Sequence, residues 1–108
     1  MRLAVIVPVF NEQESVADVV RRVPAALPGV DSVRVFVVND GSTDGTAVRA
    51  KEAGAAVLTH PERRGLAAAF RTGIHAALAD SADLVATLDA DGQYRPEDLG
   101  ILLARMKE

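Results

Sequence analysis

Residues 33–46 read VRVFVVNDGSTDGT, and this stretch decides the fold. Its first part, from Val33 to Val38, is short, mostly apolar and rich in valine, which is typical of a strand buried on both faces of a sheet. The segment Asp40-Gly41-Ser42-Thr43 predicts a turn, and a helix is expected from about Thr43 to Ala53, with Gly54 at its C-terminal end. A strand, a turn and a helix in this order form the repeating unit of an α/β fold.

The same pattern continues on both sides of this stretch. An apolar run over residues 3–9 predicts a first strand, and the spacing of valines predicts a helix over residues 12–26 that prolines close. Downstream, the sequence predicts a third strand, an Ala-rich helix, a fourth strand and a last helix, over residues 55–59, 64–79, 84–88 and 97–106. This alternation favours an α/β fold with a parallel sheet of about four strands flanked by helices.

Composition supports this architecture and excludes several classes of protein. Of the 108 residues, 49% are hydrophobic and only 4% aromatic, so Val, Leu, Ile and Ala must build the core. We expect the Ala-rich helix to pack closely through one face, formed by Leu66, Ala69, Phe70, Gly73 and Ala77. The net charge of −3 lacks the basic footprint of a nucleic-acid-binding protein, so no nucleic-acid partner is expected. Without cysteine, the chain has neither disulfides nor thiolate metal sites.

The distribution of apolar residues gives an expectation for localisation. The N-terminus lacks the pattern of a signal peptide, and no apolar run approaches the roughly 20 residues that cross a bilayer. We therefore expect a cytoplasmic protein. No internal repeat or low-complexity linker divides the sequence, so residues 1–108 are expected to belong to one domain.

The most unusual polar groups follow three of the predicted strands. Phe10-Asn11-Glu12 follows the first strand, Asn39-Asp40 follows the second, and the loop at residues 89–93 follows the fourth. In a parallel α/β sheet, ligands bind beyond the carboxyl ends of the strands. The predicted topology therefore brings three acidic segments to one edge of the sheet.

Asp89 and Asp91 are the sharpest chemical signal among these groups. Two carboxylates at positions i and i+2 of a loop can converge on one hard cation, and Gln93 can add a third oxygen. Such a site would suit Mg²⁺ or Mn²⁺. The alternative is a solvated turn, because Asp-Ala-Asp-Gly is also favourable turn chemistry.

The other candidates also have two interpretations each. Asp40 either caps the helix that follows it or accepts hydrogen bonds from a nucleoside. Asn11 and Glu12 either open a helix or border a ligand, and Phe10 either stacks on a base or packs under its loop. For Asp44, we favour a structural role in the first turn of a helix.

The basic residues divide into one candidate pair and a solvated remainder. Arg63-Arg64 precedes the Ala-rich helix, where positive charge opposes the helix dipole, so the pair either binds an anion such as a diphosphate or is solvated. Arg21-Arg22 is expected on the surface, and His60 and His75 are expected to be structural or surface residues because neither belongs to a metal-binding pattern.

Four segments in register resemble glycosyltransferase family 2, whose members have the GT-A fold. They are VIVPVFNE at residues 5–12, VVNDGSTDGT at 37–46, RGLAAA at 64–69 and LDADGQ at 88–93. The last segment, followed by Pro96-Glu97-Asp98, is most similar to the branch that makes polyprenyl-phosphate sugars, such as dolichol-phosphate mannose synthases. The sequence departs from the family pattern at Asn39, where Asp is frequent, and at Arg63, where Asn is frequent.

This resemblance implies a Rossmann-like, nucleotide-binding half of a GT-A domain and assigns its residues. The implied nucleotide-binding residues are Pro8, Phe10, Asn11, Glu12, Asn39, Asp40, Arg64, Asp89 and Ala90. The implied metal ligands, for Mg²⁺ or Mn²⁺, are Asp89, Asp91 and Gln93. The donor would be a GDP- or UDP-linked sugar, and the acceptor a polyprenyl phosphate at a membrane surface.

The family's mechanism is a direct, inverting displacement at the anomeric carbon, with a metal ion on the departing diphosphate. The sequence offers no candidate general base, although an ionised phosphate acceptor would hardly need one. Family members continue with further strands, so we expect this chain to be the donor-binding half of a longer domain.

Two other functions compete with a transferase. One is a catalytically incomplete nucleotide-binding or assembly module, in which an exposed sheet edge could support a homodimer. The other is a different α/β enzyme. A dinucleotide-binding protein would carry Gly-x-Gly-x-x-Gly after the first strand, and that motif is absent. An aspartyl phosphatase would carry Asp-x-Asp-Gly-Thr directly after a strand, and the segment at residues 40–46 does not have this pattern.

Overall fold

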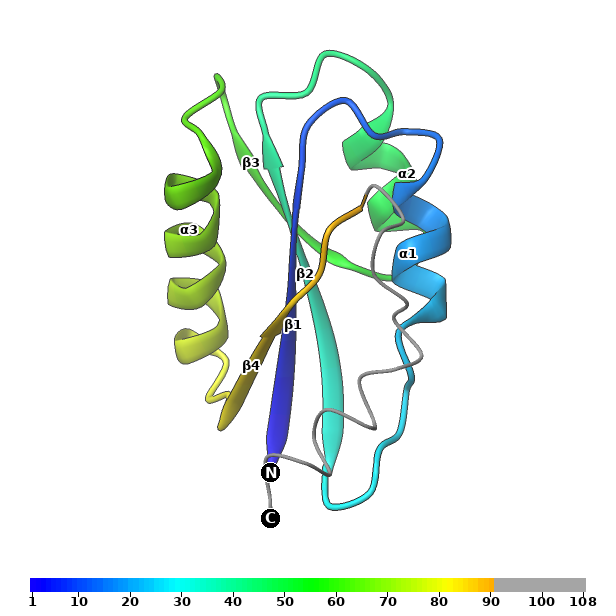
Figure 1. The fold of residues 1–108 in the computed structure, drawn as a ribbon, viewed down its shortest axis with the longest axis vertical. Helices are drawn as coiled ribbons and strands as arrows, with labels where there is room; N and C mark the ends of the chain where they lie inside the picture. The colour runs from blue at the N-terminus through cyan, green and yellow to red at the C-terminus, as the bar shows by residue number, and fades with distance from the viewer. Residues whose placement is uncertain (91–108) are drawn as a thin grey trace.

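The structure is a computed structural model that describes residues 1–90 (Figure 1). Strands and helices alternate along the chain as β1 (Arg2–Val9), α1 (Val16–Arg22), β2 (Ser32–Asp40), α2 (Thr46–Glu52), β3 (Ala56–His60), α3 (Leu66–Ala79) and β4 (Leu84–Thr87). The predicted type and order of these elements are confirmed. The last predicted helix, at residues 97–106, lies outside the described residues.

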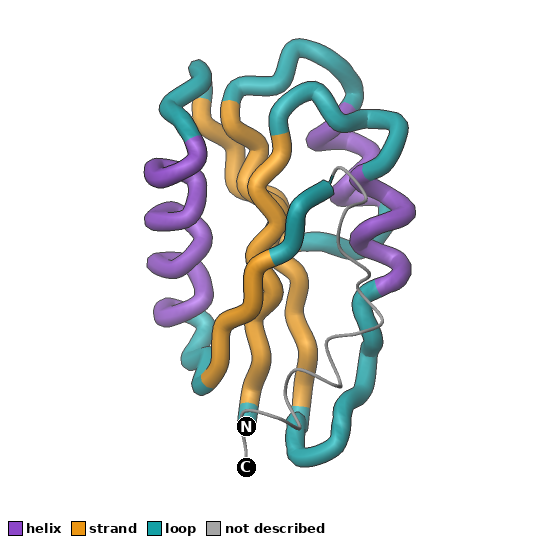
Figure 2. The backbone as a smooth tube through the Cα atoms, viewed as in Figure 1, coloured by secondary structure: helices purple, strands orange, loops and turns teal. Residues whose placement is uncertain are grey.

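The four strands form one parallel sheet in the order β3-β2-β1-β4. Figure 2 shows α3 on one face of this sheet and α1 and α2 on the other, which gives three layers. The chain places β2 and then β3 on one side of β1, and returns to place β4 on the other side. The strand order therefore reverses between β1 and β4, which is where open α/β sheets bind their ligands.

The central strand β1 is buried on both faces, as its unbroken apolar sequence predicts. Its residues Val5 and Val7 belong to a cluster with Val16 of α1, whereas Ala4 and Ile6 face α3. The core residues of this strand, from Leu3 to Val7 together with Val9, are each at most 2% exposed. Burial of this kind stabilises the fold by about 1.5 to 3 kcal/mol for each large side chain.

The helix that follows β1 is shorter than the sequence predicts. It begins at Val16 and ends at Arg22, and Ser15 takes the N-cap position without a side-chain hydrogen bond. The prediction that Asn11 caps this helix is wrong. At the other end, Val23 is extended with φ −66° and ψ 125°, because the residue before a proline is driven out of the helical region.

Similar local effects set the ends of the other two helices. Asp44 accepts a hydrogen bond from the Thr46 N–H at 3.0 Å and another from the Thr46 hydroxyl, so α2 begins at Thr46 rather than at residue 43. The expected structural role of Asp44 is thereby supported. Gly65 has φ +99°, a conformation that side chains disfavour, and α3 begins directly after it.

The α3 helix packs closely against β1 through its small residues. Ala69, Gly73 and Ala77 are buried, as predicted, but Leu66 is 60% exposed and does not belong to this buried face. A Cβ atom at Gly73 would stand 2.4 Å from Cγ2 of Ile6. No helix in residues 1–90 combines the length and apolarity that a membrane span needs.

Replacing Gly73 by Ala tests this close approach. Helix propensity alone would raise the free energy of unfolding by about 1 kcal/mol. Because the added methyl group collides with Ile6, we expect overpacking to win and the variant to be less stable by about 1 to 2 kcal/mol in urea unfolding. The exposed Ala67→Gly change in the same helix calibrates the propensity term. A more stable Gly73→Ala variant would contradict the packing described here.

Candidate functional site

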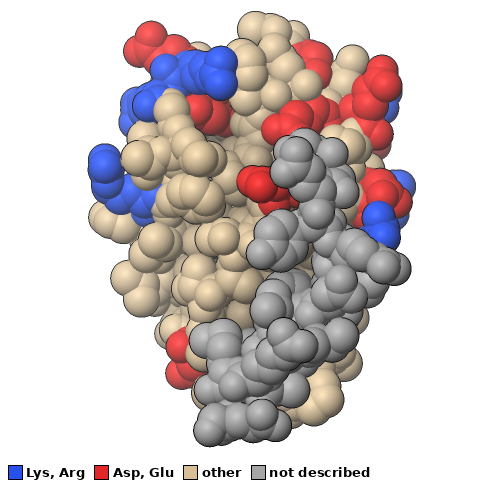
Figure 3. All heavy atoms as spheres, viewed as in Figure 1, with Lys and Arg blue, Asp and Glu red and all other residues tan. Residues whose placement is uncertain are grey.

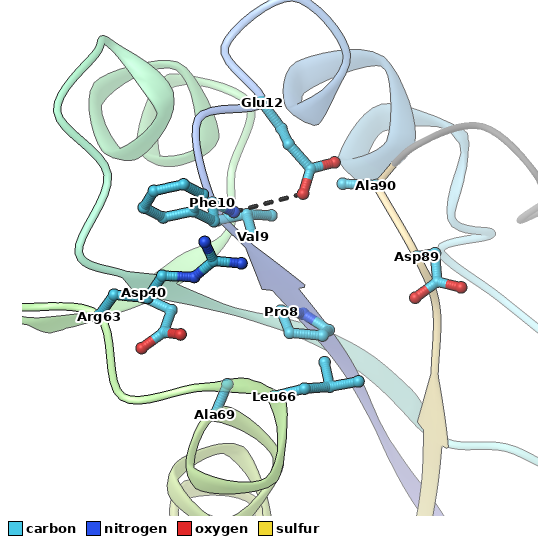
Figure 4. A pocket seen from close by; sticks show the side chains of 10 residues that line it. All are labelled: Pro8, Val9, Phe10, Glu12, Asp40, Arg63, Leu66, Ala69, Asp89 and Ala90. Carbon is cyan, nitrogen blue, oxygen red and sulfur yellow. Dashed lines mark hydrogen bonds between the residues drawn. The ribbon is translucent and has the colours of Figure 1, made fainter.

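A pocket lies at the carboxyl ends of the strands, where the strand order reverses between β1 and β4 (Figure 4). Its volume is about 170 Å³. The lining residues come from the ends of β1, β2 and β4 and from the start of α3, and they are Pro8, Val9, Phe10, Glu12, Asp40, Arg63, Leu66, Ala69, Asp89 and Ala90. Segments far apart in the sequence therefore meet in one cavity, as the predicted topology requires.

Asp40, the last residue of β2, connects three segments of the chain. Its Oδ1 accepts hydrogen bonds from the Arg64 N–H at 2.8 Å and shares one with His60 at 2.9 Å, and its Oδ2 accepts one from the Gly65 N–H at 2.9 Å. Asp40 is buried, with only 5% of the residue's surface exposed. Asp40 thus binds the N-terminal end of α3, and the prediction that it caps the helix directly after it is wrong.

These bonds decide the ionisation of Asp40. Burial alone would raise the pKa of its carboxyl group, because the charged form loses its hydration. The hydrogen bonds from Arg64, His60 and Gly65 favour the charged form and outweigh that effect, so the pKa of Asp40 lies below its ordinary value. The pocket therefore carries a fixed negative charge at neutral pH.

His60 holds the Asp40 carboxylate in place and does not itself line the pocket. Its ring is buried, with Nδ1 2.9 Å from the Asp40 carboxylate and Nε2 2.8 Å from the Thr72 hydroxyl of α3. His60 was expected to be a structural or a surface residue, and these bonds show that it is structural. The signal was the strand register: His60 is the last residue of β3 and pairs with Asp40, so the two side chains share one face of the sheet.

Gly41 allows the loop before α3 to lie against the end of β2. It has φ +79°, and a Cβ atom at this position would stand 2.5 Å from the backbone nitrogen of Arg63. Any other residue would therefore combine backbone strain with a collision. This glycine and the two backbone bonds to Asp40 fix the path of residues 62–65 along the edge of the pocket.

The loop after β1 is held by the loop after β2. Asn11, with φ 50°, donates its N–H to the Ser42 hydroxyl, and its side-chain oxygen accepts from the Thr43 N–H, each at 2.9 Å. Glu12 accepts a hydrogen bond from the Phe10 N–H at 3.3 Å and donates its own N–H to the Thr46 hydroxyl at 2.9 Å. These bonds fix the direction in which Phe10 leaves β1.

The Phe10 ring has a partner that neither interpretation of this residue included. The Arg63 guanidinium lies over the ring, with its central carbon 4.0 Å from the ring centroid. Both residues line the pocket, and Asp89 lies across the pocket from them in Figure 4. A planar cation thus rests on the aromatic face that was predicted to stack on a base or to pack under the loop.

The structure gathers most of the predicted nucleotide-binding residues. Six of them line the pocket: Pro8, Phe10, Glu12, Asp40, Asp89 and Ala90. Three do not: the Asn11 side chain bonds the neighbouring loop, the buried Asn39 accepts from the Ser42 N–H at 3.1 Å, and Arg64 contributes its backbone N–H to Asp40. Their binding roles stay predictions. Four lining residues were not in the predicted set, and Arg63 is the charged one among Val9, Arg63, Leu66 and Ala69.

The charges around the pocket are mixed. Figure 3 shows acidic side chains concentrated around the carboxyl ends of the strands, with basic side chains beside them on the α3 side. Within residues 1–90, no three Asp, Glu or His side chains lie close enough together to hold a metal ion. Of the predicted metal ligands, Asp89 lines the pocket, and Asp91 and Gln93 lie outside the described residues.

The doubly wound parallel sheet, with a pocket at its switch point, defines a Rossmann-like α/β domain. The profile of the family "Glycosyl transferase family 2" matches residues 4–108. The chain therefore belongs to glycosyltransferase family 2, as the sequence motifs predicted. Its fold is confirmed as the Rossmann-like GT-A type by the solved structures that it matches.

Two curated relatives show which branch of the family is similar. Polyprenol monophosphomannose synthase of Mycolicibacterium smegmatis is 37% identical over 108 residues, which cover 94% of this chain and 40% of the relative. An undecaprenyl-phosphate 4-deoxy-4-formamido-L-arabinose transferase of Salmonella paratyphi A is 35% identical, covering 99% of this chain and 34% of the relative. The chain thus spans about two fifths or less of these proteins.

The solved structures include an enzyme with its ligands. Glucosyl-3-phosphoglycerate synthase from Mycobacterium tuberculosis, in complex with Mn²⁺, UDP and glucosyl-3-phosphoglycerate, matches with a TM-score of 0.75 and 28% identity. The match covers 97% of this chain and 39% of the synthase. The same synthase has also been solved with Mg²⁺ and UDP, with a TM-score of 0.72.

Asp40→Asn tests the role of the buried carboxylate through pH dependence. The folded carboxyl group binds a proton less readily than the unfolded one, so its contribution to stability is complete above the ordinary pKa of about 3.9. That contribution is lost as the pH falls through the lowered pKa of the folded state.

We expect Asp40→Asn to cost about 2 kcal/mol of unfolding free energy at pH 7, and the difference from the wild type to shrink below pH 4. Chemical denaturation across this pH range measures both effects. The control Asp18→Asn, on the exposed side of α1, should change stability at pH 7 by less than about 0.5 kcal/mol. A pH-independent difference for Asp40→Asn would show that its charge contributes nothing.

Proposed function

We propose that this chain binds a nucleoside-diphosphate sugar in the pocket and serves, within a longer protein, as the donor half of a glycosyltransferase. The observation that carries this proposal is the meeting of Phe10, Asp40 and Asp89, from three different strand ends, in one cavity. An aromatic face and a fixed carboxylate suit the base and the ribose, and the second carboxylate across the cavity suits a divalent cation that would hold the diphosphate. Membership of the family supports the same assignment.

The carboxylate of Asp40 would recognise the nucleoside. Ionised Asp accepts several hydrogen bonds, so it can take one from a base N–H or a ribose hydroxyl in addition to its internal ones. Its position is fixed by the backbone of α3 and by His60, so it binds without reorganising. Phe10 would supply the apolar surface for the base, and Glu12 borders the same cavity.

We propose that Asp89, with Asp91 and Gln93, holds Mg²⁺ or Mn²⁺ at the diphosphate. The chemistry of the donors fits, because both cations prefer oxygen ligands and Mg²⁺ is commonly held by few protein groups together with substrate phosphates. Within residues 1–90, the Asp89 carboxylate makes neither a hydrogen bond nor an ion pair, and it borders the cavity. When bound, the cation would neutralise the charge that grows on the leaving diphosphate.

For the reaction, we propose an inverting displacement with a polyprenyl phosphate as the acceptor. The curated relatives support this choice, since their names state polyprenol and undecaprenyl-phosphate sugar transfer. An acceptor phosphate is already ionised, so the described residues need not contain a general base. The donor pocket would then orient the anomeric carbon, and the acceptor would approach from the face opposite the nucleotide.

The alternative is a nucleotide-binding or assembly module that does not catalyse transfer on its own. The small share of the relatives that this chain spans favours it, because acceptor residues of those proteins can lie in their remaining length. In this second proposal, two copies would join through an edge strand of the sheet, β3 or β4, since the outer edge of each pairs with no other strand among residues 1–90.

Nucleotide binding tests the donor site directly. We expect either UDP or GDP to bind in calorimetric titration, and Mn²⁺ to tighten that binding at least tenfold, in line with metal and phosphate sharing one site. Asp89→Asn should abolish the gain from Mn²⁺, whereas Asp18→Asn on α1 should keep it. No binding of either nucleotide, with or without Mn²⁺, would refute the donor site.

Turnover separates the two proposed functions. The chain is incubated with UDP- and GDP-linked hexoses, Mn²⁺ and a polyprenyl phosphate in detergent, and the released nucleotide is measured. A transferase that is complete within this chain would release nucleotide only when the lipid phosphate is present. Binding without release would identify the chain as a donor-binding module.

A further inference from the structure

Arg63 is the cation in the lining of the pocket. The other charged groups of the lining are the carboxylates Glu12, Asp40 and Asp89. A nucleoside diphosphate is an anion, so among these four groups Arg63 alone can attract it directly. The positive charge of Arg63 offsets part of the repulsion between the three carboxylates and an anionic ligand.

The guanidinium of Arg63 occupies a surface that a nucleobase could use. It stacks on the Phe10 ring at 4.0 Å, within the range of an aromatic stack. Figure 4 shows the side chain reaching from the loop before α3 across to the ring, on the side that faces Pro8. A planar cation and a planar base would compete for the same aromatic face.

The backbone of Arg63 is fixed, whereas its side chain is not. Gly41 lies directly against the Arg63 nitrogen, and the next two N–H groups are bonded to Asp40. Within residues 1–90, the guanidinium makes no hydrogen bond or ion pair, and the residue is exposed. Its contact with Phe10 is therefore the one described interaction that a movement of the side chain would break.

We propose that Arg63 exchanges partners when a nucleotide binds. In the empty pocket, the guanidinium covers Phe10; in the complex, the base takes the ring and the guanidinium moves to the diphosphate. This inference rests on the proposed donor site and assigns the anion contact to Arg63 rather than to Arg64. The exchange replaces a cation–π contact at a partly buried ring with a charge-assisted hydrogen bond, which is the stronger interaction.

The proposal predicts opposite effects for ligands with and without phosphate. Arg63→Gln removes both the charge and the cover of the ring. Affinity for the nucleoside diphosphate should then fall about tenfold, the usual effect of one charge-assisted bond. Affinity for the matching nucleoside, uridine or guanosine, should stay unchanged or rise, because the ring is no longer occupied. If Arg63 merely supported the fold, its replacement would lower the affinity for both ligands together.

The experiment compares both ligands by calorimetry or ligand-observed NMR, with Mg²⁺ present throughout. Arg63→Lys keeps the charge, so its affinity for the diphosphate should lie closer to the wild type than that of Arg63→Gln. Arg71→Gln, an exposed arginine of α3 outside the pocket lining, is the matched control and should change neither affinity. Increasing salt should weaken diphosphate binding less in Arg63→Gln than in the wild type.

The outcomes are distinct. If Arg63→Gln lowers the affinities for the diphosphate and the nucleoside by the same factor, or leaves the affinity for the diphosphate unchanged, the proposed exchange is wrong. The proposed donor site would still stand. If the wild-type protein binds neither ligand, the donor site itself fails and the exchange fails with it. Selective loss of the diphosphate, with partial recovery in Arg63→Lys, supports the exchange.

Discussion

The structure of the pocket depends on one buried carboxylate. Asp40 ends β2 and accepts hydrogen bonds from the backbone of Arg64 and Gly65, which directly precede α3, and its ring partner His60 ends β3. Two strands and a helix are thereby held in one arrangement at the carboxyl edge of the sheet. The same bonds keep the carboxylate ionised, because they stabilise its charged form more than burial disfavours it. Fold and electrostatics at this edge have a common cause.

Topology then makes this edge into a cavity. Because β2 and β4 lie on opposite sides of β1, the loops that follow the three strands diverge and leave space above the sheet. The apolar part of its lining includes Pro8, Leu66 and Ala69, and the charged part is Arg63 with the carboxylates of Glu12, Asp40 and Asp89. Apolar side chains together with a few charged groups are the usual lining of a small-molecule site. The proposed nucleotide site rests on this lining together with membership of the family.

The order of elements could be predicted from the sequence, because hydrophobic periodicity is a local property of each segment. The meeting of the strand ends could also be predicted, because alternating strands and helices generally form a parallel sheet. It did not predict the partners of the polar side chains. Asp40 caps a helix 24 residues away rather than the adjacent one, and Arg63 rather than Arg64 lines the pocket. Such choices depend on the register of β2 with β3 and on the close approach at Gly41, which arise only when distant segments pack. The predicted helices were too long by a few residues, because the residue before Pro24 and the bond from Thr46 to Asp44 set helix ends locally.

The central claim is that the edge formed by Phe10, Asp40 and Asp89 binds a nucleotide. Backbone ¹⁵N NMR of the chain, titrated with UDP and GDP in the presence of Mg²⁺, reports on this edge directly. We expect the largest shift changes at the amide of Phe10, which lines the pocket, and at the amides of Arg64 and Gly65, which bond the lining residue Asp40. Changes confined to the opposite end of the sheet, near Asp31 and Asp83, would contradict it.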